Sequence, residues 1–140
     1  MQNSSTTTLG QTTASASMPV VLASDQGAPV MVSATIADSA SLSGGVDLGG
    51  RALVGIVTPA GWTTAVMTFQ VSTDNSTWLE YEDVNGTAIT IPSTAASKYR
   101  AIDAADFLGV RYLKVRSGTS GSAVNQSGSD VVTLVTRSVL

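Results

Sequence analysis

The chain has 140 residues, enough for one domain and a shorter additional segment. Charged residues make up only 12% of it, and it contains no His and no Cys, which excludes disulfides, thiolate metal sites and catalysis by either side chain. The net charge of −3 argues against nucleic-acid binding, and no apolar stretch approaches the roughly 20 residues that a membrane span needs. We therefore expect neither nucleic acid nor membrane among its partners.

The first part of the chain has the features of an extended arm. Residues 1–17 are dominated by Ser and Thr and carry no charge, so they bury too little apolar surface to order themselves, and we expect a partner subunit to hold them. Residues 18–32 contain two apolar runs, each preceded by a proline, which belongs at the start or edge of a strand. The residues expected to dock the arm are Val20, Val21, Leu22, Val30 and Val32.

Two interpretations of these apolar runs stay open. They can add strands to the sheet of a neighbouring subunit, or they can complete the sheet of their own chain. Residues 33–50 are rich in Ser, Ala and Gly, with glycine pairs at 44–45 and 49–50 that interrupt regular structure. We place the boundary near residue 45, which gives an N-terminal arm over 1–45 and a globular domain over 46–140.

The pattern of the globular part predicts strands throughout. Residues 51–57 are apolar on both faces, which is typical of a central strand, and residues 66–82 predict a β-hairpin. In that hairpin, apolar residues from Ala65 to Val71 alternate with polar ones, and residues 74–76 supply the turn. A short strand is expected over 87–91 and stopped by Pro92, because proline cannot donate to a ladder.

The remaining strands are expected over 98–102, 111–116 and 130–140. A loop or single helical turn separates the first two at 103–107, and a long Gly/Ser loop over 117–129 separates the last two. In 111–116, Leu113 and Val115 face one side, while Tyr112, Lys114 and Arg116 face the other. Short strands and turns at this spacing predict an all-β fold, a β-sandwich or jelly roll.

Few residues point to chemistry, and we expect no catalytic residue, no metal ligand, no cofactor and no enzymatic activity. Glu80, Glu82 and Asp83 cluster after Trp78, which favours a solvated strand end over a weak calcium site. Trp62 and Tyr112 are candidate contacts for a sugar, which would need two exposed rings side by side.

Two resemblances rest on these segments. FQVSTDNSTWLEYEDV, followed later by RYLKVRSG, resembles the discoidin or galactose-binding-like jelly roll at Ser72, Asp74, Trp78, Arg111 and Tyr112. That family's paired Cys residues are absent here, and the connections are shorter. This resemblance implies the jelly-roll fold.

The second resemblance covers the two ends of the chain. SMPVVLASDQGAPVMV, with RYLKVRSGTSGSAVNQSGSDVVTLVTR, is similar to small virion proteins of tailed bacteriophages and related gene-transfer particles. The resemblance implies a non-enzymatic virion structural protein, a capsid decoration or head-fibre subunit docked by its arm, assembled in the host cytoplasm. Its expected partners are the major capsid protein or other virion subunits, and further copies in a homo-oligomer. The alternatives are a neck or tail component, or a module that binds a host surface glycan.

Overall fold

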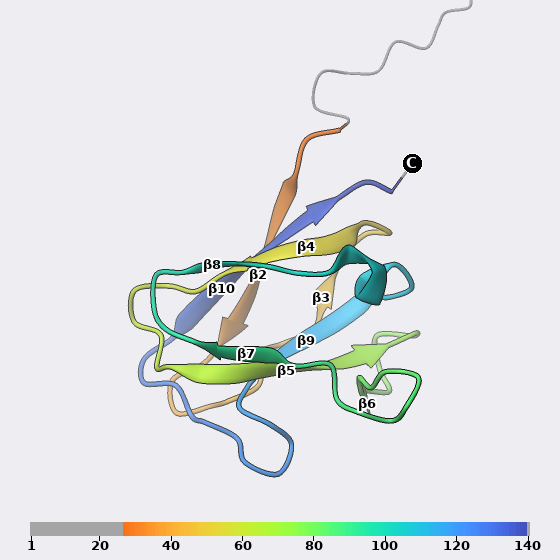
Figure 1. The fold of residues 1–140 in the computed structure, drawn as a ribbon. Helices are drawn as coiled ribbons and strands as arrows, with labels where there is room; N and C mark the ends of the chain where they lie inside the picture. Colours follow the sequence, from red (N-terminus) through yellow and green to blue (C-terminus); the bar gives the residue numbers. More distant parts are fainter. Residues whose placement is uncertain (1–26, 140) are drawn as a thin grey trace, which may run out of the picture.

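The computed structural model describes residues 27–139, and the expected docking residues Val20, Val21 and Leu22 lie outside this range. The described chain is nearly all β and forms two antiparallel sheets packed face to face, seen as the upper and lower layers of Figure 1. The predicted all-β sandwich is therefore confirmed. Within residues 27–139, no helix is long and apolar enough to cross a membrane.

The first sheet has four strands in the order β2-β10-β4-β8. These are β2 (Val30–Ile36), β10 (Asp130–Arg137), β4 (Ala52–Val57) and β8 (Tyr99–Ala101). As predicted from its two apolar faces, β4 is central, with β10 on one side and β8 on the other. The pairing of β10 with β4 shifts between Val135 and Thr136, where a bulge interrupts the register.

The second sheet follows the order β3-β9-β5-β6, and β7 also pairs with β5. Its strands are β3 (Val46–Asp47), β9 (Tyr112–Ser117), β5 (Ala65–Ser72), β6 (Leu79–Glu80) and β7 (Ile91–Thr94). The predicted hairpin is present as β5 and β6 joined by residues 73–78. The predicted alternation in β9 also holds, because Leu113 and Val115 are fully buried between the sheets.

A cluster of aromatic rings fills one end of the core. Phe69 of β5 meets Phe107 edge to face, with ring centroids 5.3 Å apart, and Tyr81 meets the same Phe107 ring at 5.6 Å. Phe107 ends the short 3₁₀ helix η2 (Ala104–Phe107), whose first turn is capped by the Asp103 carboxylate accepting from the Ala105 amide at 3.1 Å. The helical turn expected at 103–107 thus brings a large aromatic side chain into the sandwich.

The second apolar run of the expected arm belongs to this chain's own sheet. All seven residues of β2 pair with β10, and Ala34 and Ile36 are fully buried. Val32 is partly buried against the core, whereas Val30 stays 40% exposed. The sandwich therefore begins near residue 30, before the boundary predicted near residue 45. The Gly-rich residues after β2 form a connection between the two sheets, in which Leu42 pairs with Arg116 of β9.

The strand expected over 87–91 is displaced along the chain. β7 runs from Ile91 to Thr94 and contains Pro92, the residue expected to stop it. Its ladder with β5 consists of the partners Met67↔Ile91 and Ala65↔Thr94 around an irregularity. Pro92 is exposed and outside both pairs, so the missing amide costs no ladder hydrogen bond there.

A buried carboxylate at the start of β10 gives a first prediction. Asp130 lies opposite Ile36 on the core side and is 4% exposed, and its Oδ2 has no hydrogen-bond partner among the described residues. An unsatisfied buried polar group costs about 1–3 kcal/mol. We expect Asp130→Val to raise the free energy of unfolding in denaturant titration by about 1 kcal/mol or more, and Asp130→Asn to gain less. A lower stability for Asp130→Val would contradict this account of the site.

Candidate functional site

The β5–β6 loop, residues 73–78, is held in one shape by a single carboxylate. Oδ1 of Asp74 accepts hydrogen bonds from the amides of Ser76 and Thr77 at 2.9 and 2.8 Å, and from the Ser72 hydroxyl at 2.9 Å. These bonds lower the pKa of Asp74 from 3.8 to about 2, with the Thr77 amide contributing most to the shift. A charged carboxylate is thus the clamp of this loop at neutral pH.

The clamp predicts a pH dependence. Because the folded pKa of Asp74 lies below its ordinary value, its stabilisation is complete above about pH 4 and is lost as the pH falls toward 2. We expect Asp74→Asn to have a lower melting temperature than the wild type near about pH 6, and the gap to narrow near about pH 2.5. Thermal unfolding followed by circular dichroism measures both values, and a gap of equal size at both pH values would contradict the clamp.

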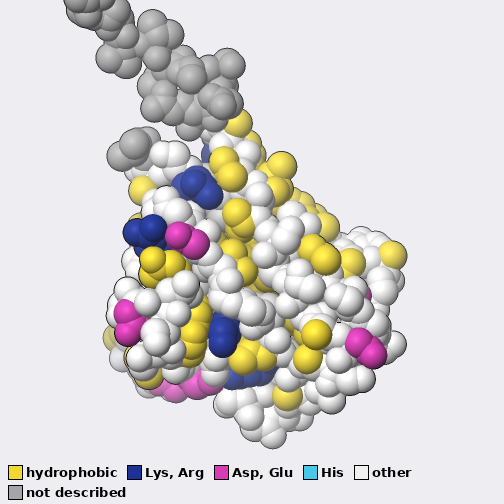
Figure 2. Space-filling view, turned by 180° about the vertical axis from the view of Figure 1, so that it is seen from behind, with side chains coloured by type: hydrophobic (Ala, Val, Ile, Leu, Met, Phe, Trp, Pro, Cys, Tyr) yellow, Lys and Arg dark blue, Asp and Glu magenta, His cyan; other side chains and the backbone are white. Residues whose placement is uncertain are grey.

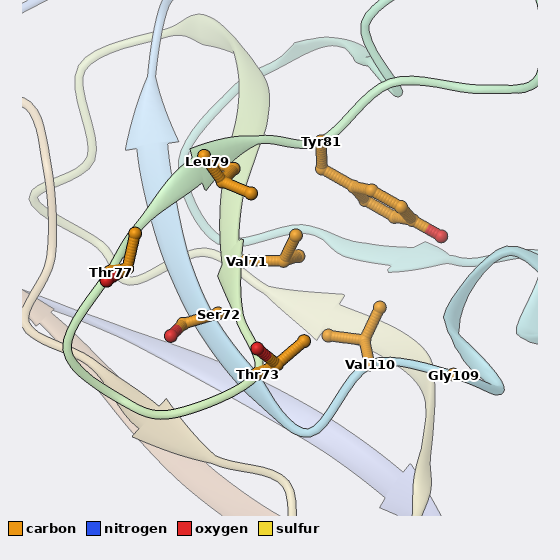
Figure 3. A pocket seen from close by; sticks show the side chains of 8 residues that line it. All are labelled: Val71, Ser72, Thr73, Thr77, Leu79, Tyr81, Gly109 and Val110. Carbon is orange, nitrogen blue, oxygen red and sulfur yellow. The ribbon is translucent and has the colours of Figure 1, made fainter.

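A pocket of about 320 Å³ opens on the inner side of this loop (Figure 3). Its walls come from three places in the chain: the end of β5 with its loop, the strand β6 with Tyr81, and the residues before β9. The lining residues are Val71, Ser72, Thr73, Thr77, Leu79, Tyr81, Gly109 and Val110. Figure 3 shows the Val71, Leu79 and Val110 side chains around the same hollow, with the Tyr81 ring beside them.

The pocket suits an uncharged group. None of its eight lining residues is charged, and its polar groups are hydroxyls. The Tyr81 hydroxyl donates to the Asp106 carbonyl, and burial raises the pKa of Tyr81, so the phenol is a neutral donor and no base. At the lower end of typical ligand-pocket volumes, the hollow has room for a small ligand or for aliphatic side chains of a partner.

Trp78 lies on the other side of the loop, over the outer face of the second sheet. The Lys114 amine is 4.6 Å from the centroid of its ring, and a Cβ at Gly45 would lie 2.8 Å from its outer edge. Gly45 directly precedes β3 and Lys114 belongs to β9, so the Trp78 side chain reaches from the end of β6 toward the opposite edge of the sheet. Ser72, paired with Tyr112 of β9, is only 5% exposed, and its hydroxyl is bonded to the Asp74 carboxylate.

The structure does not bring the two candidate sugar contacts together. Trp62 is 4% exposed within the core, and its indole nitrogen donates to the Thr94 carbonyl at 3.0 Å, so it offers no ring to a ligand. Tyr112 is half-buried on the outer face, paired with Ser72 of β5, with the Arg111 guanidinium 5.2 Å from its ring. The second aromatic ring on that face belongs to Trp78. Because side chains alternate along a strand, its position two residues before the outward-facing Glu80 could have predicted this.

The acidic residues near this face are engaged in structural contacts. Glu80 binds the Arg116 guanidinium through two bonds of 2.7 and 2.6 Å, and it accepts from Gln70 at 2.8 Å, which together lower its pKa. Asp83 accepts from the amides of Asn85 and Thr87. In the part of the chain that the structure describes, no three acidic side chains lie close enough to hold a metal ion. Glu80, Glu82 and Asp83 therefore do not form a shared site here.

Comparison with known proteins adds no assignment. No known protein family, curated protein or solved structure matches this chain.

Proposed function

We propose that the chain is a non-enzymatic structural subunit of a bacteriophage virion, a capsid decoration or head-fibre protein docked by its N-terminal segment. The observation that carries the proposal is the continuity of that segment with β2. The segment leads directly into a strand whose seven residues all pair with β10, next to the central strand β4. A force applied to the segment would therefore be resisted by the hydrogen bonds between the strands of the first sheet.

The junction has a further anchor and an apolar surface. Arg137 at the end of β10 donates a hydrogen bond to the Gly27 carbonyl, three residues before β2. Val30 and Met31 at the start of β2 are 40% and 60% exposed. Figure 2 shows hydrophobic side chains gathered below the point where the grey segment joins the sandwich. A docking surface that begins in the segment would continue onto these residues.

The chemistry of the described residues also supports a structural role. The charged groups around the β5–β6 loop form contacts within the fold: Asp74 with its loop amides, Glu80 with Arg116, and Asp47 with Arg111 at 3.1 Å. The resemblance of residues 18–26 and of the C-terminal part to small virion proteins is the reason for proposing that the chain is part of a phage particle. The discoidin-like pattern supports the interpretation of the sandwich as a jelly roll. We infer no ligand from it.

Fractionation of particles tests the proposal. Phage or gene-transfer particles are purified from the source cells on a density gradient, and the chain is quantified against the major capsid protein by mass spectrometry. We expect the chain to band with the particles in a fixed, many-copy ratio. If the chain stays in the soluble fraction while the capsid protein bands, the virion proposal fails.

A glycan-binding module on a virion or cell surface is the second candidate, favoured by the aromatic outer face. Tyr112 pairs with Ser72 there, the Trp78 ring lies over the Lys114 amine, and the Gln70 side chain is on the same face. We expect any glycan bound there to be lost from an array with Trp78→Ala and retained with Trp62→Phe, because Trp62 is buried. Binding that survives Trp78→Ala would place the glycan elsewhere.

A further inference from the structure

The pocket beside the β5–β6 loop has walls that the fold holds in place. Asp74 fixes the loop through three hydrogen bonds to its Oδ1. The Tyr81 ring packs edge to face on the buried Phe107, with ring centroids 5.6 Å apart, and the Tyr81 hydroxyl donates to the Asp106 carbonyl. Walls that are already fixed lose little conformational freedom when the hollow is filled, which favours binding.

The pocket presents branched aliphatic side chains to its occupant. Val71 and Leu79 come from the paired strands β5 and β6, and Val110 precedes β9. Figure 3 shows these three side chains around the hollow, with the Tyr81 ring beside them. Val110 is 9% exposed whereas Leu79 is 63% exposed, so the hollow has a buried floor and one open side. An occupant that fills it buries an aliphatic group at the floor and continues out of the open side, as a side chain on a longer chain does.

The open side carries groups that suit a peptide backbone. Thr73 and Thr77 are exposed there, and a hydroxyl can both donate and accept a hydrogen bond. Gly109 is also exposed, and a Cβ at this position would meet no atom within 4 Å. The absence of a side chain at a glycine lets another backbone approach closely. The amides of an approaching segment can thus find partners while its side chain fills the floor.

The charges beside the pocket select for an uncharged occupant. Asp74 lies in the loop between two lining residues, Thr73 and Thr77. Asp106 lies beside Tyr81, whose pKa is raised by burial and by the charge of that carboxylate. An anion brought here would lose its hydration and gain no opposite charge. A cation would find the Asp74 carboxylate already bound to the loop amides.

We propose that the pocket binds an uncharged peptide segment of a partner protein by taking up one Val, Leu or Ile side chain of that segment. A small molecule would leave the open side uncovered, whereas small-molecule pockets normally bury most of the surface of their ligand. β6 is the outermost strand of the second sheet, so a segment can reach the pocket without meeting a further strand. That the segment belongs to another virion subunit rests on the proposed structural role, and the binding itself does not.

Titration of the isotope-labelled full-length chain with blocked amino acids, followed by NMR, tests the pocket in solution. N-acetyl-leucine amide has the side chain and two amides but no charge. It should shift the amide resonances of Leu79, Gly109 and Val110 with a Kd in the millimolar range, as expected for so small a ligand. N-acetyl-leucine, which adds a carboxylate, should bind about threefold more weakly or worse. N-acetylglycine amide, which lacks the side chain, should leave these resonances unchanged.

Two exposed aliphatic residues provide the variant and its matched control. Leu79→Asp puts a charge on the pocket wall and should weaken the binding of N-acetyl-leucine amide about tenfold or more, and Leu79→Ala should weaken it less. Val84 is 97% exposed in the connection between β6 and β7 and does not line the pocket, so Val84→Asp should bind as the wild type does. The dispersion of the amide spectrum shows whether each variant is folded.

Each other outcome overturns the proposal. If N-acetyl-leucine amide causes no shift at millimolar concentration, or N-acetylglycine amide causes the same shifts, the pocket takes up no side chain. Binding that survives in Leu79→Asp lies elsewhere. Cyclohexanol is an uncharged aliphatic alcohol without amides, and if it binds as tightly as N-acetyl-leucine amide, the pocket belongs to a small molecule. No particles enter this experiment, so its failure leaves the particle fractionation as an independent test of the virion proposal.

Discussion

Replacing Phe107 by Ala should lower the free energy of unfolding by about 3–5 kcal/mol, the usual cost of truncating a buried aromatic residue. Phe107 is 1% exposed and makes edge-to-face contacts with both Phe69 and Tyr81. Its ring also holds η2 against the core, since η2 lies beside β4. Truncation would leave a cavity where sheets and helix meet, and a single small side chain cannot refill it.

Urea titration followed by tryptophan fluorescence measures this loss. The neighbouring Leu108 offers a matched control, because it is 62% exposed and next in the chain. Leu108→Ala should change the stability by about 0.5 kcal/mol or less, as surface substitutions usually do. Similar losses for the two variants would mean that Phe107 does not occupy the core position described here.

The second large effect is expected from Glu80→Ala. The Arg116 side chain is only 8% exposed, and Glu80 binds it through two short bonds, so removal of the carboxylate would leave a nearly buried guanidinium without its counter-charge. Breaking a buried pair in this way costs about 3–5 kcal/mol. Because the Glu80 side chain is 38% exposed, water can partly replace it, and we expect a loss of about 2–3 kcal/mol.

Two comparisons separate the ion pair from general effects of charge. Glu82→Ala removes the same charge from an exposed position and should leave the stability nearly unchanged. Combining Glu80→Leu with Arg116→Met removes both partners and should recover most of the loss, because no charge is then left unpaired. If the double variant is less stable than Glu80→Ala, the pair contributes more than the relief of a buried charge.

The strands of the sandwich could largely be predicted from the sequence, because each carries a period-two or two-faced apolar pattern. β5 and β9 have clear alternation, and Phe69, Leu113 and Val115 are fully buried as that pattern predicts. The central position of β4 followed from its two apolar faces. These patterns are local, so the sequence of each segment is enough to predict that it forms a strand.

The arrangement that depends on distant contacts could not be predicted. Whether β2 pairs within the chain depends on β10, about a hundred residues later. The sequence of neither strand indicates which strand it pairs with. Trp62 was a candidate sugar contact, a role that would require an exposed ring, but it is 4% exposed. Trp62 belongs to the hydrophobic core, where its indole nitrogen donates to the Thr94 carbonyl of β7, a strand that begins later than the sequence predicted.

The pocket and the aromatic face were missed for the same reason. The pocket joins the β5–β6 loop to residues 109–110, which come together only because β5 and β9 pair. Trp78 lies over the outer face, with the Lys114 amine 4.6 Å from its ring centroid, whereas the neighbouring Leu79 lines the pocket. The Asp74 turn was visible in the sequence, and the structure adds the three hydrogen bonds that fix it.

The most direct measurement of the docking role is incorporation of variant chains into purified particles. Val20→Asp combined with Leu22→Asp places charges in the apolar run, and Ser5→Asp combined with Thr7→Asp places the same charges elsewhere in the same segment. The account predicts that the first pair abolishes banding with the particles and the second pair leaves it unchanged. Equal incorporation of both double variants, at the wild-type ratio to capsid protein, would contradict docking through the N-terminal segment.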